Sequence, residues 1–138
     1  MSDPNERNKQ IIAEFRANGG QVGGFFTNRP ILLLHTTGAK SGLSRVNPLV
    51  YMADGDRWII IASKGGAPTH PDWYYNLLAN PKVSIEVGTE HVPVTAAIAE
   101  EPERSELYAK MAAQHHFFAD YAQKVVTRVI PVIILTRR

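Results

Sequence analysis

Residues 36–48 read TTGAKSGLSRVNP and lie between two apolar runs. Such a pattern predicts a strand, a glycine-rich turn and a second strand. The two glycines let the backbone fold tightly, while Lys40, Ser41 and Arg45 supply cationic and hydroxyl donors. Successive backbone N–H groups in a tight turn form an anion-binding concavity, and arginine holds phosphate oxygens in bidentate fashion. The stretch therefore predicts a phosphate site, and the alternative is a plain surface hairpin whose cations are merely solvated.

The same stretch does not fit two common nucleotide motifs. A P-loop needs a glycine, four residues and then Gly-Lys-Ser/Thr opening a helix, whereas Lys40 and Ser41 precede the second glycine here. Pro48 and the apolar run after it indicate a strand instead of a helix. A dinucleotide fingerprint would also need a strand-to-helix turn. The expected ligand is phosphorylated, but it is neither bound by a P-loop nor held as a dinucleotide.

The composition describes one globular domain, which we expect to span residues 1–138. The chain has 44% hydrophobic and 20% charged residues, a net charge of +2 and no cysteine. This small net charge argues against a nucleic-acid partner, and the lack of cysteine excludes disulfides and thiolate metal sites. The cations Arg29, Lys40 and Arg45 lie in a segment without acidic residues, which favours a small anionic ligand.

Targeting signals are weak in this sequence. No apolar run approaches the ~20 residues of a membrane span, and the first residues are polar. We therefore expect a cytoplasmic protein, with weak or no membrane association; contact with the inner membrane face would be peripheral. The five histidines are scattered or adjacent, and no metal site is predicted.

The periodicity of the chain predicts an α+β fold that is mainly β. A surface helix is expected within residues 1–20, and a ligand-binding barrel over 31–136. About six antiparallel strands with three to four helices suggest a small barrel whose gaps the helices fill. The predicted strands are 31–37, 45–53, 57–64, 83–87, 91–99 and 130–136; the later helices begin at Pro71 and Pro102 and around 117–121.

A second informative segment follows the third predicted strand. Residues 62–66, ASKGG, are small or polar and would let a flat ligand approach the backbone closely. Trp73 could wall a planar ring; the alternative is that it is simply a core residue of a short helix. Together with the phosphate turn, this segment favours a planar phosphorylated cofactor.

These blocks resemble the deazaflavin-dependent nitroreductase and quinone reductase family of actinobacteria, which uses coenzyme F420. The resemblance covers about residues 31–134. It is carried by TTG at 36–38, KSG at 40–42, RVNPL at 45–49, ASKGG at 62–66, WY at 73–74 and NPKV at 80–83. It implies a split β-barrel related to flavin-mononucleotide (FMN)-binding barrels, and an oxidoreductase activity.

The resemblance also implies roles for individual residues. Lys40, Arg45 and Ser41 would hold the phosphate region; Asn47, Pro48 and Leu49 would line the path of the cofactor along the strand; Ala62, Ser63, Lys64 and Gly65 would border the ring, with Trp73 beside the pocket; Phe118 and Tyr121 would face the substrate. Three positions depart from the family pattern. Ala39 stands where arginine is frequent, Val50 where an aromatic residue occurs, and Phe118 lacks the hydroxyl of nitroimidazole-activating members.

The implied reaction transfers a hydride from reduced F420 to an electron-poor acceptor, a quinone or a nitroaromatic compound. Ser63 or Lys64 would donate a hydrogen bond to the developing negative charge, and Tyr121 would position the substrate or deliver a proton. Two alternatives stay open: an oxidoreductase of the same fold that uses FMN, and a non-catalytic carrier of F420. The protein is expected to be a monomer or a homodimer.

Overall fold

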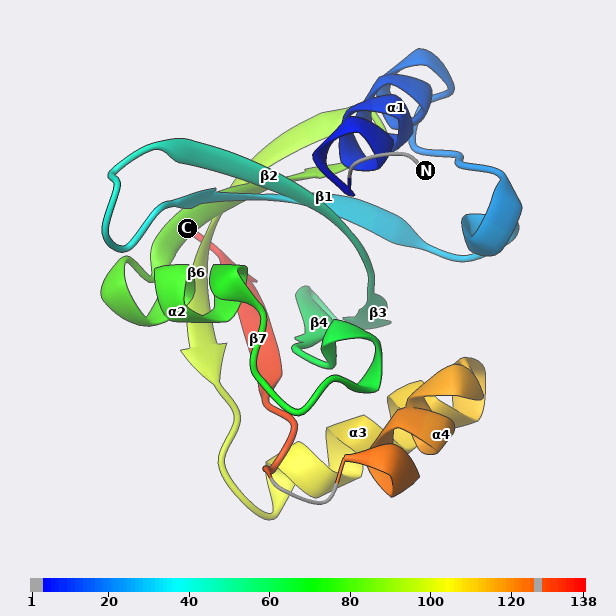
Figure 1. Ribbon diagram of the computed structural model, residues 1–138, viewed down its shortest axis with the longest axis vertical. Helices are drawn as coiled ribbons and strands as arrows, with labels where there is room; N and C mark the ends of the chain where they lie inside the picture. The colour runs from blue at the N-terminus through cyan, green and yellow to red at the C-terminus, as the bar shows by residue number, and fades with distance from the viewer. Residues whose placement is uncertain (1–3, 126–127) are drawn as a thin grey trace.

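The computed structural model describes residues 4–125 and 128–138. Within them, seven strands form one antiparallel sheet in the order β2-β1-β5-β6-β7-β4-β3 (Figure 1). The strands are β1 (Ile31–Thr37), β2 (Ser44–Val50), β3 (Met52–Asp54), β4 (Arg57–Ile61), β5 (Lys82–Val87), β6 (Glu90–Ile98) and β7 (Val132–Arg137). The helices are α1 (Pro4–Ala17), α2 (Asp72–Ala79), α3 (Glu103–Gln114) and α4 (Phe117–Lys124), with short 3-10 helices η1 (Gly24–Phe26) and η2 (Lys64–Gly66).

The two edges of the sheet are joined by a single residue. Tyr51 separates β2 from β3, yet these two strands lie at opposite edges of the sheet. The sheet must therefore curl until its edges meet, which gives the split β-barrel that the family resemblance implied. The predicted strand 45–53 is in fact two strands, because the chain leaves the β1 edge at Val50 and joins β4 at Met52. This division raises the strand count from about six to seven.

Both faces of the sheet are buried, so several strands are apolar at successive positions. On one face, Leu32 and Leu34 of β1 pack with Trp73 and Leu77 of α2. On the other face, the neighbouring Leu33 packs in a cluster that includes residues of α1, α3 and α4. Burial of one such leucine stabilises the fold by about 1.5–3 kcal/mol. No helix of the described ranges is long and apolar enough to cross a membrane.

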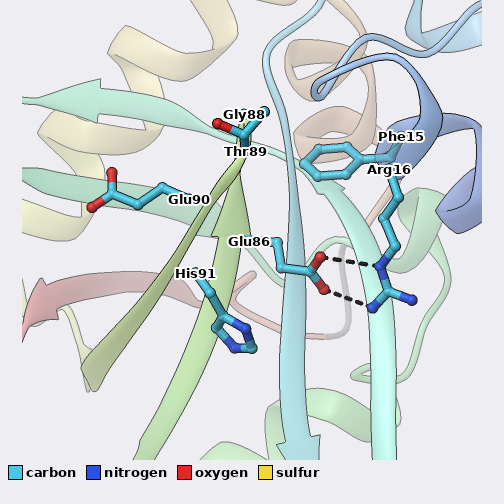
Figure 2. Close-up of a pocket in the computed structure, with 7 residues that line it drawn as sticks. All are labelled: Phe15, Arg16, Glu86, Gly88, Thr89, Glu90 and His91. Atoms are coloured by element: carbon cyan, nitrogen blue, oxygen red, sulfur yellow. Dashed lines mark hydrogen bonds and ion pairs between the residues drawn. The ribbon is translucent and has the colours of Figure 1, made fainter.

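Helix α1 is attached to the sheet by a buried phenylalanine and an ion pair (Figure 2). Phe15 is 1% exposed, and Arg16 donates to both carboxylate oxygens of Glu86 on β5, at 3.1 and 2.8 Å. The Nε2 atom of His35 lies 2.6 Å from one of these oxygens. The Arg16 hydrogen bonds, and then that of His35, lower the pKa of Glu86 to about 2. The ionised carboxylate thus links α1 to β1 and β5.

We expect Glu86→Gln to lower the free energy of unfolding by about 1–3 kcal/mol at pH 7, because the ion pair is only partly exposed to solvent. The folded-state pKa lies below the unfolded value of 4.5. The contribution is therefore complete above that value and is lost as the pH falls towards 2. Urea unfolding of both proteins between pH 7 and pH 3 measures it.

The control is Glu90→Gln, whose ion pair with Arg137 is exposed on both sides. It should change stability by less than about 1 kcal/mol. A difference between wild type and Glu86→Gln that did not narrow below pH 4 would contradict the assignment.

Candidate active site

A pocket of about 140 Å³ opens where β2 and β4 diverge. The register pairs Met52 with Ile59, but among the described strands β2 itself pairs only with β1, so β2 and β4 separate beyond Val50 and Ile61. The pocket is lined by Pro48, Leu49, Val50, Ile61, Ser63 and Gly65, together with the aromatic residues Phe25, Phe26, Phe117, Phe118 and Tyr121. Pro48 is tolerated because β2 is an edge strand and needs no ladder partner on its open side. A flat, largely apolar ligand suits this fork.

The aromatic wall of the pocket comes from two segments far apart in the chain, η1 and α4. The rings of Phe25 and Phe117 are 5.2 Å apart, and the guanidinium of Arg29 lies 4.4 and 4.6 Å from their centroids. Cation–π contacts of this kind are worth about 0.5–2 kcal/mol each. Arg29 therefore joins the two halves of the wall. In the sequence, Arg29 was identified only as a member of the cluster of cations. Its contact with Phe117 was not predicted, because the two residues are far apart in the sequence.

A buried tyrosine fixes the position of α4. The hydroxyl of Tyr108, on α3, donates to the carbonyl of Phe118 at 2.6 Å. Burial raises the pKa of Tyr108 to about 12, so the phenol stays protonated and keeps donating. The hydrogen bond from Tyr108 thus holds α4 with its aromatic residues toward the pocket.

The loop after β4 adopts an unusual backbone. Lys64, Gly65 and Gly66 all have positive φ angles, of 50°, 62° and 82°. Left-handed backbone is disfavoured for a residue with a side chain, and such strain persists where the surroundings enforce it. A Cβ atom on Gly65 would meet nothing within 4 Å, and Gly65 lines the pocket. Glycine at this position therefore leaves the pocket open for a ring.

The β1–β2 turn presents fewer amides than the sequence predicted. The N–H groups of Gly38, Ala39, Gly42 and Leu43 donate within the protein. The amides of Lys40 and Ser41 are those that remain for an anion within the described turn. The Ser41 hydroxyl accepts from the Leu43 amide at 3.2 Å, so it shapes the turn from inside. The expected row of outward amides is therefore limited to two.

Asn76 of α2 holds this turn in place, and no sequence pattern predicted this role. Its side-chain oxygen accepts from the Ala39 amide at 2.9 Å, and its amide nitrogen donates to the Thr36 hydroxyl at 3.1 Å. Asn76 is 7% exposed. Because buried polar groups are costly when unpaired, this arrangement fixes the turn relative to α2.

Positive charge lies on the same strand as the pocket. Arg45 and Leu49 share one face of β2, since they are four residues apart on an extended strand. Leu49 lines the pocket, and Arg45 is exposed about 13 Å away along the strand. Lys40 is also exposed on the adjoining turn. A ligand with its ring in the fork could therefore extend an anionic tail along β2 to these cations.

The predicted site residues do not all reach the pocket. Pro48, Leu49, Ser63, Gly65, Phe118 and Tyr121 line the pocket; Lys40, Ser41 and Arg45 lie on the exposed turn and the start of β2; Asn47 is half-buried on the connecting stretch; Ala62 and Trp73 are buried in the core, and Lys64 is exposed. Trp73 is 6% exposed in the cluster beneath α2 and is absent from the pocket lining, which matches the alternative interpretation of this residue. The Nζ atom of Lys64 donates to Thr69 at 3.2 Å.

Comparison with known proteins identifies the family of this chain. Residues 7–137 match the model of the F420H(2)-dependent quinone reductase family. An F420H(2)-dependent quinone reductase of Mycobacterium tuberculosis (strain ATCC 25618 / H37Rv) is 42% identical over 130 residues, which cover 91% of this chain and 87% of the relative.

Two solved structures are also similar. One, an F420-H2 dependent reductase (FDR-A), has a TM-score of 0.71 and 40% identity, covering 82% of this chain and 99% of that one. Another, described as a domain-swapped dimer, has a TM-score of 0.72 and 36% identity, covering 96% and 99%. The chain therefore belongs to the F420H(2)-dependent quinone reductase family and is an oxidoreductase, and coenzyme F420 is the cofactor of this family.

The residues present fit such a cofactor. The fork offers aromatic walls for a planar ring, and Gly65 leaves the space that a side chain would fill. Ser63 provides a hydroxyl at the pocket, while Arg45 and Lys40 can meet a phosphate and an acidic tail. An apolar slot with a few convergent polar groups is typical of cofactor sites.

We expect Gly66→Ala to destabilise the protein by about 2 kcal/mol or more and to displace α4. Its φ is +82°, and a Cβ atom would lie 3.2 Å from Cδ1 of Tyr121 and 3.1 Å from Cδ of Lys124. The matched control is Gly65→Ala, which has φ of +62° but open space around the new methyl group. It should cost only the backbone term of about 1–2 kcal/mol. Equal losses in thermal or urea unfolding would show that α4 does not pack on this loop.

Proposed function

We propose that the protein binds reduced F420 in the fork between β2 and β4 and reduces a quinone there. One observation carries the proposal: the aromatic pocket lies at one end of β2, and the cations of β2 and of the β1–β2 turn lie at the other. Membership of the F420H(2)-dependent quinone reductase family supports the choice of cofactor and of acceptor class.

When bound, reduced F420 supplies a hydride. The protein therefore has to bind the cofactor, orient its ring toward the acceptor and shield both from water. Lys40 and Arg45 would hold the phosphate and the acidic tail by charge-assisted hydrogen bonds. Pro48 and Leu49 would support the ring on one side, and Gly65 would admit it closely on the other. Ser63 would donate a hydrogen bond to a ring oxygen that gains negative charge.

The acceptor would lie against the aromatic face of α4. Phe118 and Tyr121 line the pocket, and the Tyr121 hydroxyl can hold the oxygen of an acceptor by a hydrogen bond. Hydride transfer to a quinone leaves an oxyanion that needs one proton to complete the hydroquinone, and Tyr121 or water can donate it. The aromatic wall would keep bulk water from the transferring hydride.

Quinones are the preferred acceptor class because the wall of the pocket is largely aromatic and apolar. Nitroaromatic reduction is less favoured, since the buried Phe118 offers no hydroxyl to a nitro group. An FMN-dependent enzyme or a non-catalytic F420 carrier would use the same turn, so binding and turnover must be measured separately.

The function is tested by adding purified protein to reduced F420 under anaerobic conditions, with menadione or a nitroimidazole as acceptor. We expect steady oxidation of the cofactor with menadione, followed by its absorbance, and slower oxidation with the nitro compound. Tight F420 binding without turnover would indicate a carrier. Binding of FMN in preference to F420 would reject the proposal.

We expect Lys40→Ala combined with Arg45→Ala to weaken F420 binding by at least about 100-fold, since each lost charge-assisted contact is worth about 1.5–3 kcal/mol. The remaining affinity should depend less on salt than that of the wild type, because screening acts on exposed charges. Fluorescence titration at two ionic strengths measures both effects. The matched control removes two exposed cations elsewhere, Lys82→Ala with Lys110→Ala. Unchanged affinity in the first double variant would show that the phosphate assignment is wrong.

A further inference from the structure

Arg29 lies at the opposite end of β1 from the other two predicted cations. It precedes the start of β1 at Ile31, whereas Lys40 follows the end of the strand at Thr37. A strand of seven residues spans about 23 Å, so Arg29 cannot share one phosphate with Lys40 and Arg45. The cluster of cations in the sequence is therefore divided in the structure, and Arg29 needs a separate explanation.

The guanidinium of Arg29 packs against the aromatic wall of the pocket. Its Cζ atom lies 4.4 Å from the ring centroid of Phe25 and 4.6 Å from that of Phe117, and both rings line the pocket. The ring of Phe117 lies in turn 4.3 Å from that of Phe118, which lines the pocket as well. Arg29 itself is absent from the lining. The cation therefore stands behind the rings that a ligand would touch.

No carboxylate pairs with Arg29 within the described residues. None of their ion pairs includes it, and its Nη1 atom is buried without a hydrogen-bond partner among them. A buried polar atom without a partner calls for an explanation. Arg128 shows the contrast, because it donates to the carbonyl oxygens of Ala62, Ser63 and Ala67 at 2.9–3.2 Å and so holds the loop after β4. The charge of Arg29 has no such use within the protein.

A histidine beside the same wall responds to the charge of Arg29. The ring of His115 lies 5.9 Å from that of Phe117. Burial, and then the charge of Arg29, lower the pKa of His115 below its ordinary value of 6.5. His115 is therefore neutral at pH 7 and adds no second cation here. Its pKa also measures, without any ligand, the field that Arg29 produces at this wall.

A cation on one side of an aromatic ring acts on what binds at the other side. The face of such a ring carries negative partial charge, which a cation over the ring offsets. A ligand stacked on Phe25 or Phe117 would lie about 8 Å from the guanidinium, because packed layers are about 3.5–4 Å apart. That separation does not exceed the screening length of physiological salt, about 8 Å. The wall should therefore attract an anionic ring more strongly than a neutral one.

We propose that Arg29 is a positioning residue that places an unpaired positive charge behind Phe25 and Phe117, so that the acceptor wall binds an aromatic anion in preference to a neutral ring of the same shape. The proposal names a second anion-selective part of the site, at the other end of β1 from the cations of the β1–β2 turn.

The proposed reaction forms such an anion, and the role of Arg29 in turnover rests on the proposed function. A quinone that accepts one hydride gains two electrons and one proton and becomes the hydroquinone monoanion, with the two electrons coming from reduced F420. One further proton, from Tyr121 or water, completes the hydroquinone. The negative charge is present in the transition state and absent from the quinone. A charge that interacts with it lowers the barrier without tightening quinone binding.

The binding test uses 2-naphthoate and 2-naphthamide, which share a ring system and differ in charge at pH 7.5. Calorimetry measures both affinities, in the protein alone and with oxidised F420 bound. We expect the wild type to prefer 2-naphthoate by at least about tenfold. Arg29→Gln should reduce this preference to within about twofold, whereas Arg29→Lys keeps the charge and should retain the preference within about threefold of the wild-type ratio.

The kinetic test separates stabilisation of the anion from simple packing. In Arg29→Gln, the single-turnover rate of F420 oxidation by menadione should fall about tenfold, while the KM for menadione should stay within about threefold. A residue that only packed the wall would change the affinity for neutral and anionic rings alike. Arg29→Lys should recover most of the rate, because it restores the charge.

A measurement without cofactor or probe completes the set. The pKa of His115, followed by NMR, should rise in Arg29→Gln and stay near the wild-type value in Arg29→Lys. The matched control is Arg137→Gln, since the guanidinium of Arg137 lies 5.6 Å from the ring centroid of Trp58, which does not line the pocket. This variant should leave the probe ratio, the single-turnover rate and the His115 pKa unchanged.

Equal affinity of the wild type for the two naphthalene probes would overturn the proposal without any variant, and so would a wild-type probe ratio in Arg29→Gln. If Arg29→Gln does not fold, loss of the preference in Arg29→Lys would overturn it instead. Failure of the wild type to oxidise reduced F420 with menadione would reject the proposed function. The probe ratio in the protein alone and the His115 pKa would then still decide whether Arg29 charges the wall.

Discussion

The single residue between β2 and β3 is the constraint on which the site depends. Because Tyr51 joins opposite edges of the sheet, β2 must leave β1 at the point where β3 joins β4. The strands then cannot pair beyond Val50 and Ile61, and a fork is unavoidable. A further strand could close the open edge of the fork only if the connection between β2 and β3 were longer than one residue. Helices α1 and α3 cover one face of the sheet and α2 covers the other, while α4 supplies part of the wall of the fork.

The parts of the site that could be predicted from the sequence are local. They are the turn at 38–43, the residues of β2 that follow it and the small residues after β4. Each is made of residues close together in the chain, so patterns of glycine, proline and charged residues identify it. The fork itself was not predicted, because a strand over 45–53 looks continuous in its apolar pattern. Only pairing with distant strands shows that it divides at Tyr51.

The residues that sequence reasoning missed act over long separations. Arg128 holds a loop 66 residues away, and Asn76 holds a turn 37 residues away. Arg29 bridges rings at positions 25 and 117. None of these residue types is unusual at its place in the sequence, and each has an ordinary surface role by default. Trp73 was predicted beside the pocket because it stands near a motif; the structure buries it with Leu77 in the cluster under α2.

The site carries positive charge in two physically different forms. Lys40 and Arg45 are exposed, so their fields are screened by salt beyond about 8–10 Å and their side chains can adapt to a flexible tail. Arg128 is only partly buried, but five hydrogen bonds to backbone carbonyls and to His70 hold its guanidinium in one place. Adaptable cations such as Lys40 and Arg45 suit the flexible tail of a cofactor, which only has to be retained. A cation that is held in one place instead fixes the loop that carries Ser63 and Gly65, because its hydrogen bonds reach the carbonyls of Ser63 and Ala67 on both sides of the left-handed residues.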